Sequence, residues 1–305
     1  MIPTYRPQEA FLRKTLESVL QQDAGADTMQ IEVVDDGSPE GNVEAMVKSI
    51  AGARVQISRT PKNLGLAGCW NTCIERARGQ WVHLLHHDDY VLPGFYAQLK
   101  ESMEKHPGVA LVASRCFSVD EQDVILDVSP RVPELESGKR AVECFFYANP
   151  IQCPGVVMRR EFYEAHGGFR PDLFFVLDVE MWARAVGLVG GVVLPEVLAC
   201  FRTSEGQTTS RLERSGESLR DVRRLIEIYA SQYPEFDRQR SLRQLCEKTL
   251  EQARNFSKAG DAEAARANWD FWRTLPATLR LTVFASRLAL TLSRRLALRK
   301  SQAYE

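Results

Sequence analysis

The sequence predicts an α/β protein with a mostly parallel central sheet and helices on both faces, followed by an all-helical C-terminal region. Three observations support this architecture. Short runs rich in β-branched residues alternate with segments whose apolar residues recur at helical spacing. Two of these runs end in adjacent carboxylates, as strands of an open α/β sheet do where they face a ligand. Strand candidates stop at about residue 211, so we expect one domain over residues 1–211 and a helical region over 212–305.

The order of segments predicts βαβ units in the first domain. Pro3 and Pro7 end a first strand, and a helix follows over residues 8–22. Residues 116–138 are expected to be irregular. Further strands are expected at 31–34, 55–57, 81–85, 109–114, 156–158, 192–194 and 197–201, and further helices at 43–50, 67–77, 93–106, 161–166 and from Asp178 onward. In the second region, helices are expected at 216–232, 238–258, 262–274 and 277–299.

Composition narrows the class of protein. The chain has 305 residues, of which 44% are hydrophobic, enough to build a sizeable core. The net charge of -1 gives no indication of a nucleic-acid partner. The seven cysteines are an odd number without the paired spacing of a zinc site, and we expect reduced thiols in a cytoplasmic protein. Neither a secretory signal nor a membrane-spanning segment is predicted.

The run at 81–85 leads into Asp88 and Asp89. Adjacent carboxylates at the end of a strand offer hard oxygen ligands of the kind that Mg²⁺ and Mn²⁺ take. The alternative is a simple polar turn, because Asp is a common turn residue. Asp36 ends the run at 31–34, and Asp178 stands where a helix is expected to start.

Together these acids meet the requirements of sugar transfer from a nucleotide diphosphate. Departure of the diphosphate needs a divalent cation, which Asp89 can hold with Asp88 in support. Asp36 is placed to hydrogen-bond the base or the ribose. Asp178 can remove the proton of an attacking sugar hydroxyl, a role worth about 10²–10⁴-fold in rate. Its alternative role is that of a helix cap.

Five motifs carry a resemblance to a known family. They are Ile-Pro-Thr-Tyr at 2–5, Val-Val-Asp-Asp-Gly-Ser at 33–38, Asn-Leu-Gly-Leu-Ala-Gly at 63–68, Leu-His-His-Asp-Asp at 85–89 and Leu-Asp-Val-Glu-Met-Trp at 177–182. In order and spacing they resemble the signatures of the family 2 inverting glycosyltransferases, over roughly residues 1–210. The resemblance implies the Rossmann-like GT-A fold of nucleotide-diphospho-sugar transferases and a single in-line displacement that inverts the anomeric carbon.

The resemblance also implies which residues bind the nucleotide. Pro3, Thr4 and Tyr5 match the loop that contacts the nucleobase, and Asp36 matches the acid that binds the base or ribose. Family members place several more residues before Ile-Pro-Thr-Tyr, so Met1 falls inside their first strand. We expect that the natural start lies upstream. The alternative is a sheet that lacks most of a central strand, which would leave buried backbone groups unpaired.

For the metal and the base, the resemblance implies that Asp89 is the direct ligand and that Asp88 supports it. Asp178 matches the acid proposed as the catalytic base in the family. Two departures bear on these assignments. Leu177 stands where relatives have a second acid, and Ser204 stands where a histidine often lies close to the diphosphate.

Two further features have alternative interpretations. On a strand, His83 and His87 would face one way and His86 the other, so no histidine metal site is expected. The segment 278–300 alternates leucines with arginines, which suits either peripheral contact with the inner face of an anionic membrane or packing on the rest of the chain.

The predicted function is therefore metal-dependent transfer of a sugar to a glycan or lipid-linked acceptor, in the synthesis of a cell-surface polysaccharide or another glycan. The alternative is a non-catalytic nucleotide- or carbohydrate-binding module with the same fold. A nuclease or polymerase is disfavoured, because no basic groove accompanies the acids.

Overall fold

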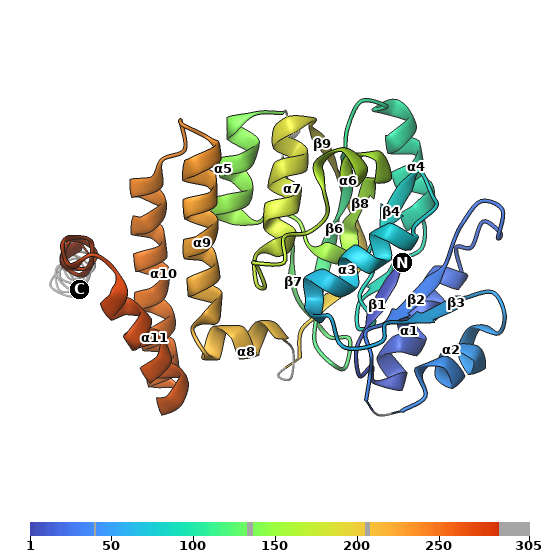
Figure 1. Cartoon of the computed structure of the whole chain (residues 1–305), viewed down its shortest axis with the longest axis horizontal. Helices are drawn as coiled ribbons and strands as arrows, with labels where there is room; N and C mark the ends of the chain where they lie inside the picture. The colour runs from blue at the N-terminus through green and yellow to red at the C-terminus, as the bar shows by residue number, and fades with distance from the viewer. Residues whose placement is uncertain (40, 133–136, 205–207, 287–305) are drawn as a thin grey trace, which may run out of the picture. The chain divides into compact units, whose positions relative to one another are not determined.

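The computed structural model describes residues 1–39, 41–132, 137–204 and 208–286, and the chain divides into two units, residues 1–205 and 206–305 (Figure 1). The division falls close to the change of character predicted near residue 211. The functions assigned to the two parts remain predictions.

Short strands and helices alternate in the first unit, as the sequence predicted. The strands are β1 (Ile2–Thr4), β2 (Glu32–Asp35), β3 (Gln56–Arg59), β4 (Trp81–His83), β5 (Tyr90–Val91), β6 (Leu111–Val119), β7 (Ile125–Val128), β8 (Val156–Arg159) and β9 (Gly191–Arg202). The helices are α1 (Glu9–Leu20), α2 (Val43–Ala51), α3 (Gly65–Arg76), α4 (Phe95–Lys105), α5 (Lys139–Ala148), α6 (Arg160–His166) and α7 (Leu177–Leu188), and a short 3-10 turn covers Cys153–Gly155.

The strands form mixed sheets, so the prediction of a mostly parallel sheet is wrong. β1, β2 and β3 pair in that order and are parallel. The second sheet has the order β4-β8-β6-β9-β5, with β7 beside β6. Among its described pairs, β6 and β9 are parallel and the others are antiparallel. Periodicity reveals a strand but not its direction, and β8, inserted between β4 and β6, runs opposite to both.

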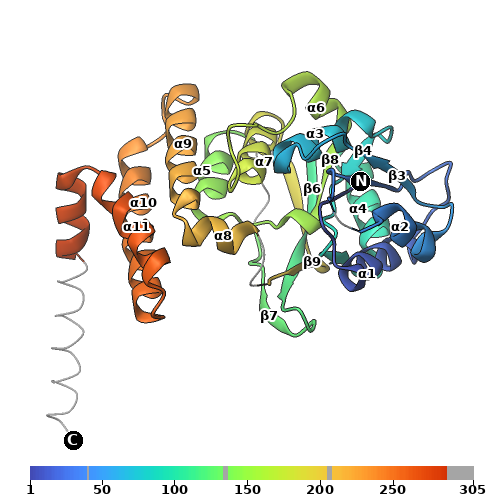
Figure 2. The same cartoon turned by 60° about the horizontal axis from the view of Figure 1, so that its bottom comes forward.

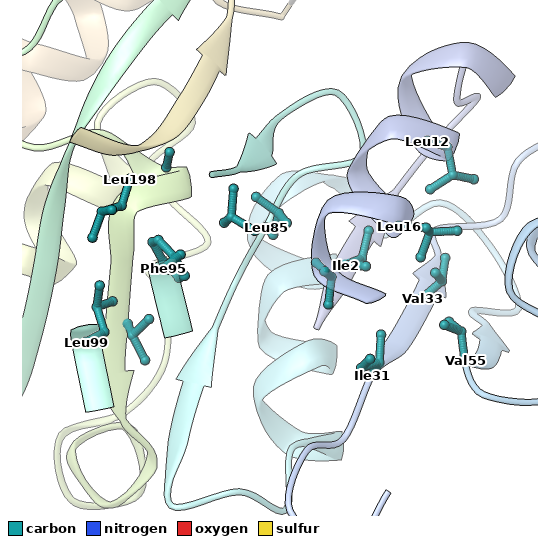
Figure 3. Close-up of a cluster of buried hydrophobic side chains, with 14 of the residues drawn as sticks. Ile2, Leu12, Leu16, Ile31, Val33, Val55, Leu85, Phe95, Leu99 and Leu198 are labelled. Atoms are coloured by element: carbon teal, nitrogen blue, oxygen red, sulfur yellow. The ribbon is translucent and has the colours of Figure 1, made fainter. Parts of the chain in front are cut away.

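Helices cover both faces of the strands, as predicted. Figure 2 shows α1, α2 and α4 on one side and α3, α6 and α7 on the other. On the first side, apolar side chains of α1 and α4 pack against alternate residues of the strands, including Ile2, Val33 and Leu198 (Figure 3). Leu12, Leu16 and Phe95 are fully buried in this cluster, and each such side chain contributes roughly 1.5–3 kcal/mol.

Several local features differ from the predictions for the first unit, among them β5 and α5, which were not expected. β6 continues to Val119 and turns into β7, although residues 116–138 were expected to be irregular. The two strands expected at 192–194 and 197–201 are one strand, β9, which bulges where it pairs with β6. β4 ends at His83, before the predicted end of that strand at residue 85.

The second unit consists of helices in its described part. They are α8 (Thr208–Arg214), α9 (Glu217–Gln232), α10 (Arg238–Lys258) and α11 (Ala262–Thr274), followed by helical residues 277–286. The predicted bounds of α9, α10 and α11 are confirmed to within about one residue, because Asp237 and Asp261 cap α10 and α11 through their side chains. Of the segment 278–300, the part after residue 286 lies outside the described residues. In the described part of the chain, no helix is long and apolar enough to cross a membrane.

Candidate active site at two acidic turns

The first acidic turn follows β2 and holds the start of α3. The Asp36 carboxylate is 3% exposed. Its Oδ1 accepts the backbone N–H of Leu64 at 2.8 Å and the Thr60 hydroxyl at 3.1 Å, and its Oδ2 accepts the N–H of Gly65 at 3.1 Å. These are N–H groups at the start of a helix, which lack partners within the helix. Asp36 therefore satisfies them from a neighbouring strand.

The rest of this turn is also fixed by hydrogen bonds and close packing. Asp35 Oδ1 accepts the N–H of Ser38 at 3.1 Å, and Oδ2 lies 3.3 Å from the Arg59 guanidinium. Gly37 has a φ of 67°, and a Cβ there would lie 2.8 Å from the backbone of Lys62. Asp35 thus shapes the turn, and glycine is required beside it because a larger residue would collide with the facing loop.

The loop after β1 lies at the same edge as the first acidic turn. The carbonyl of Thr4 accepts the N–H of Asp36 at 2.8 Å. His87, next to the second acidic turn, hydrogen-bonds the backbone of Pro3. Pro3 and Thr4 are buried, whereas Tyr5 is exposed. The structure therefore brings Thr4 to the first acidic turn and Pro3 to the residue before the second, whereas Tyr5 is exposed.

The second acidic turn leaves one buried carboxylate oxygen without a hydrogen bond. Asp89 is 1% exposed, its Oδ1 accepts the backbone N–H of Arg202 at 2.8 Å, and its carbonyl accepts the Thr15 hydroxyl at 2.6 Å. In the described structure Oδ2 has no hydrogen-bond partner; His86 Nδ1 lies 3.4 Å away, beyond a well-formed bond. Burial raises the pKa of Asp89 to about 6, the charge of Asp88 adds to this rise, and His86 opposes it.

A fully buried arginine fixes the position of this turn. Arg202 Nε donates to the carbonyl of Asp88 at 2.9 Å, Nη1 to that of Asp120 at 2.8 Å, and Nη2 to the carboxylate of Asp123 at 2.7 Å. Its guanidinium also stacks on Phe11. The sequence analysis did not identify Arg202, because an arginine at a strand end gives no sign that it will be buried.

His86 joins the two acids in a cluster that could hold a metal ion. One donor atom each from His86, Asp88 and Asp89 lie within 4.8 Å of one another. The imidazole stacks on Trp70, with ring centroids 4.9 Å apart, and its Nε2 lies 3.6 Å from the Cys153 sulfur. Burial opposes the charged imidazole, but the acidic partners Cys153 and Asp89 outweigh it and raise the pKa of His86.

The expectation of no histidine metal site rested on a backbone geometry that the structure does not have, and the absence of such a site stays a prediction. It assumed strand geometry through residue 87, but β4 ends at His83 and the alternation of faces ends there. His83 itself is part of the fold: its ring nitrogens lie 3.1 Å from the Tyr96 hydroxyl and 3.0 Å from the Pro154 carbonyl. Burial lowers the pKa of His83 to about 3.

Asp178 lies in the first turn of α7 and does not cap it. The N-cap is Val176, and Asp178 Oδ1 accepts the N–H of Val179 at 2.7 Å. Burial raises the pKa of the Cys153 thiol, and the charges of Asp178 and Asp89 raise it further. Asp178 and Asp89 thus both act electrostatically on the Cys153 thiol, and the role of Asp178 as a base stays a prediction.

The donor set fits Mn²⁺ or Mg²⁺. Two carboxylates can supply oxygens, and a buried carboxylate oxygen without a hydrogen bond is costly unless a cation satisfies it. The fold and the candidate site are of the kind found in nucleotide-sugar transferases, with a possible cation cluster at His86, Asp88 and Asp89.

Comparisons with known proteins agree with this class. Residues 1–167 match the family described as Glycosyl transferase family 2, and the chain belongs to that family. The amylovoran biosynthesis glycosyltransferase AmsE of Erwinia amylovora is 28% identical over 203 residues, which cover 66% of this chain and 73% of AmsE.

Solved structures show the same fold. TarS 1-349 of S. aureus, in complex with UDP-GlcNAc, superposes with a TM-score of 0.61 at 16% identity, over 91% of this chain and 81% of TarS. The mannosyltransferase PcManGT of Pyrobaculum calidifontis, in complex with GDP-Man and Mn²⁺, gives a TM-score of 0.55 at 16% identity, over 95% and 79% of the two chains.

Proposed function

We propose that this chain is an inverting glycosyltransferase that moves a sugar from a nucleotide diphosphate sugar to a hydroxyl acceptor in polysaccharide or other glycan synthesis. The observation that carries the proposal is Asp89 Oδ2, a buried anionic oxygen without a hydrogen bond, beside Asp88 and the nucleotide-binding edge. The relative AmsE, named for polysaccharide biosynthesis, and the sugar nucleotides bound to TarS and PcManGT support it.

At the nucleotide end, Pro3, Thr4 and Tyr5 contact the base, and Asp36 binds the base or ribose. A carboxylate has about four acceptor positions, so Asp36 can accept a ligand hydrogen bond while it holds the start of α3. Asp89, supported by Asp88, would hold Mn²⁺ or Mg²⁺. When bound, the cation neutralises the negative charge of the departing diphosphate.

At the acceptor end, Asp178 takes the proton of the attacking hydroxyl. The acceptor oxygen then bonds to the anomeric carbon as the bond to the diphosphate breaks, with inversion at that carbon. The acceptor is a glycan or a lipid-linked sugar. Contact of the segment 278–300 with a membrane remains a prediction; in its described part, Leu281 and Phe284 are exposed.

Turnover of sugar nucleotides tests the proposal. The protein should release UDP or GDP from its donor when Mn²⁺ or Mg²⁺ is present, and this release should stop after EDTA is added. Asp178→Asn should lower turnover by about 10²–10⁴-fold and leave nucleotide binding nearly unchanged. Glu161→Gln, an exposed carboxylate at the start of α6, is the control and should retain activity.

Two outcomes would contradict this function. Turnover that persists in EDTA would remove the role of Asp89 as a metal ligand. Metal-dependent nucleotide binding without transfer to any acceptor or to water would instead identify a binding module.

A further inference from the structure

His86 is held by contacts that fix the plane of its ring. Trp70 stacks on one face at an interplanar angle of 27°, and the side chain is 22% exposed. Nε2 lies 3.6 Å from the sulfur of Cys153, while Nδ1 lies 3.4 Å from Asp89 Oδ2. The ring therefore presents one nitrogen to a thiol and the other to the carboxylate oxygen that lacks a hydrogen bond.

The neighbouring histidines are arranged differently. Both ring nitrogens of His83 have partners in the fold, the Tyr96 hydroxyl and the Pro154 carbonyl. His87 hydrogen-bonds the backbone of Pro3. Within this stretch of the described chain, His86 is the histidine that joins Asp88 and Asp89 in a set of donor atoms.

This arrangement matches the way proteins prepare a metal-binding imidazole. A metal-bound histidine donates its second N–H to a neighbouring acceptor, which fixes the tautomer and the ring orientation. Here Nε2–H would donate to Cys153, leaving the Nδ1 lone pair directed at Asp89. Because the Cys153 S–H donates to the Leu84 carbonyl at 3.7 Å, the sulfur is left to accept Nε2–H, and metal binding requires the lone pair on Nδ1 that this tautomer provides.

We infer that His86 is a third protein ligand of the cation, through Nδ1, and that the site selects Mn²⁺ and later first-row divalent ions over Mg²⁺. The inference rests on the proposed function and specifies its metal. Imidazole suits transition ions, whereas Mg²⁺ favours oxygen ligands and water, so a nitrogen donor beside two carboxylates shifts the preference.

Pulsed electron paramagnetic resonance of bound Mn²⁺ tests this directly. Mn²⁺ is added to the full-length protein with and without UDP or GDP, and the echo is examined for modulation from a directly coordinated ¹⁴N nucleus. The wild type should show this modulation. His86→Asp, which replaces the nitrogen with a carboxylate, should bind Mn²⁺ without it, whereas His87→Gln, which removes a neighbouring imidazole, should retain it.

Affinities give the second readout. Calorimetry should show that His86→Gln weakens Mn²⁺ binding by about tenfold or more and Mg²⁺ binding by much less. His86→Asp should narrow the ratio of Mn²⁺ to Mg²⁺ affinity. Circular dichroism of each variant establishes that it is folded.

The outcomes separate this inference from the proposed function. Bound Mn²⁺ that depends on Asp89 but shows no nitrogen modulation would overturn the role of His86 and leave the metal-dependent transferase intact. If Mn²⁺ binds neither in the presence nor in the absence of nucleotide, the role of His86 and the metal-dependent transferase function are both contradicted. A third outcome is sugar transfer that proceeds without metal and is abolished by His86→Gln. This result would show that the imidazole takes the place of the cation, and the inference would be wrong.

Discussion

The two acidic turns look alike in the sequence and differ in their hydrogen bonds. Each is an Asp-Asp pair after a short apolar run, and Asp36 and Asp89 are both almost fully buried. Both carboxylate oxygens of Asp36 accept hydrogen bonds from the loop before α3. Asp89 has a hydrogen bond at Oδ1, whereas Oδ2 has none in the described structure.

The difference arises from what faces each pair. The first turn faces the start of a helix, where free N–H groups are abundant. The second faces the end of β9, where Arg202 offers one backbone N–H and directs its side chain to other acceptors. A satisfied carboxylate organises the backbone, whereas an unsatisfied one retains the capacity to bind a cation.

Of the paired substitutions at the two turns, replacement of the neighbouring arginine should give the largest difference in stability. Arg202→Met should lower the free energy of unfolding by about 3–5 kcal/mol, because it removes three charge-assisted hydrogen bonds of a buried guanidinium. Arg59→Met removes the half-exposed partner of Asp35 and should cost less than about 1 kcal/mol. Urea unfolding measures both. Equal effects would show that the second turn does not depend on its buried guanidinium.

Replacing the buried aspartate of each turn with asparagine should change the free energy of unfolding in opposite directions. Asp36→Asn should lower the free energy of unfolding by roughly 1.5–3 kcal/mol, because it weakens charged hydrogen bonds to the loop before α3. Asp89→Asn should raise the stability of the metal-free protein near neutral pH, because burial makes its charged form unfavourable, as the raised pKa indicates. The same urea experiments test this. If Asp89→Asn destabilised the protein more than Asp36→Asn, the comparison would fail.

The pH dependence of stability separates His83 from the site, and near neutral pH its effect is small. Its pKa is about 3 in the folded chain, against about 6.5 when unfolded, so between these values the unfolded chain binds the proton and the folded chain does not. This contribution to stability is complete above about pH 6.5 and falls on acidification by up to about 1.4 kcal/mol per pH unit. His83→Gln should flatten the dependence measured by urea unfolding at a series of pH values. If His83→Gln left the slope of stability against pH unchanged, His83 would not be held in its neutral form by the folded chain.

Much of the fold follows from periodicity. Helices α9, α10 and α11 have the predicted bounds, because capping aspartates, glycine and proline mark their ends, whereas α8 was not predicted. Strand direction could not be predicted, since β8 pairs antiparallel to β4 and β6 through contacts distant in sequence. The hairpin of β6 and β7 was missed because all four β7 residues are exposed and show no buried face.

The candidate site was predictable in its acids and not in their surroundings. Asp36, Asp89 and Asp178 are recognisable because they follow apolar runs or precede a segment with helical periodicity. The roles of Cys153, Trp70 and Arg202 depend on tertiary contacts that local sequence does not encode. His86 was left out of the predicted site by an argument from strand alternation, and the strand β4 ends at His83, before the residues to which that argument was applied.

The most direct test of the central claim is stabilisation by nucleotide and metal together. Thermal unfolding is followed with UDP or GDP, with and without Mn²⁺, for the wild type and Asp89→Asn. We predict that one nucleotide diphosphate with Mn²⁺ stabilises the wild type, by about 2.7 kcal/mol at 100 times its Kd, and that EDTA or Asp89→Asn removes most of this gain. Equal stabilisation in EDTA, or in Asp89→Asn, would contradict the claim that the second acidic turn holds the cation.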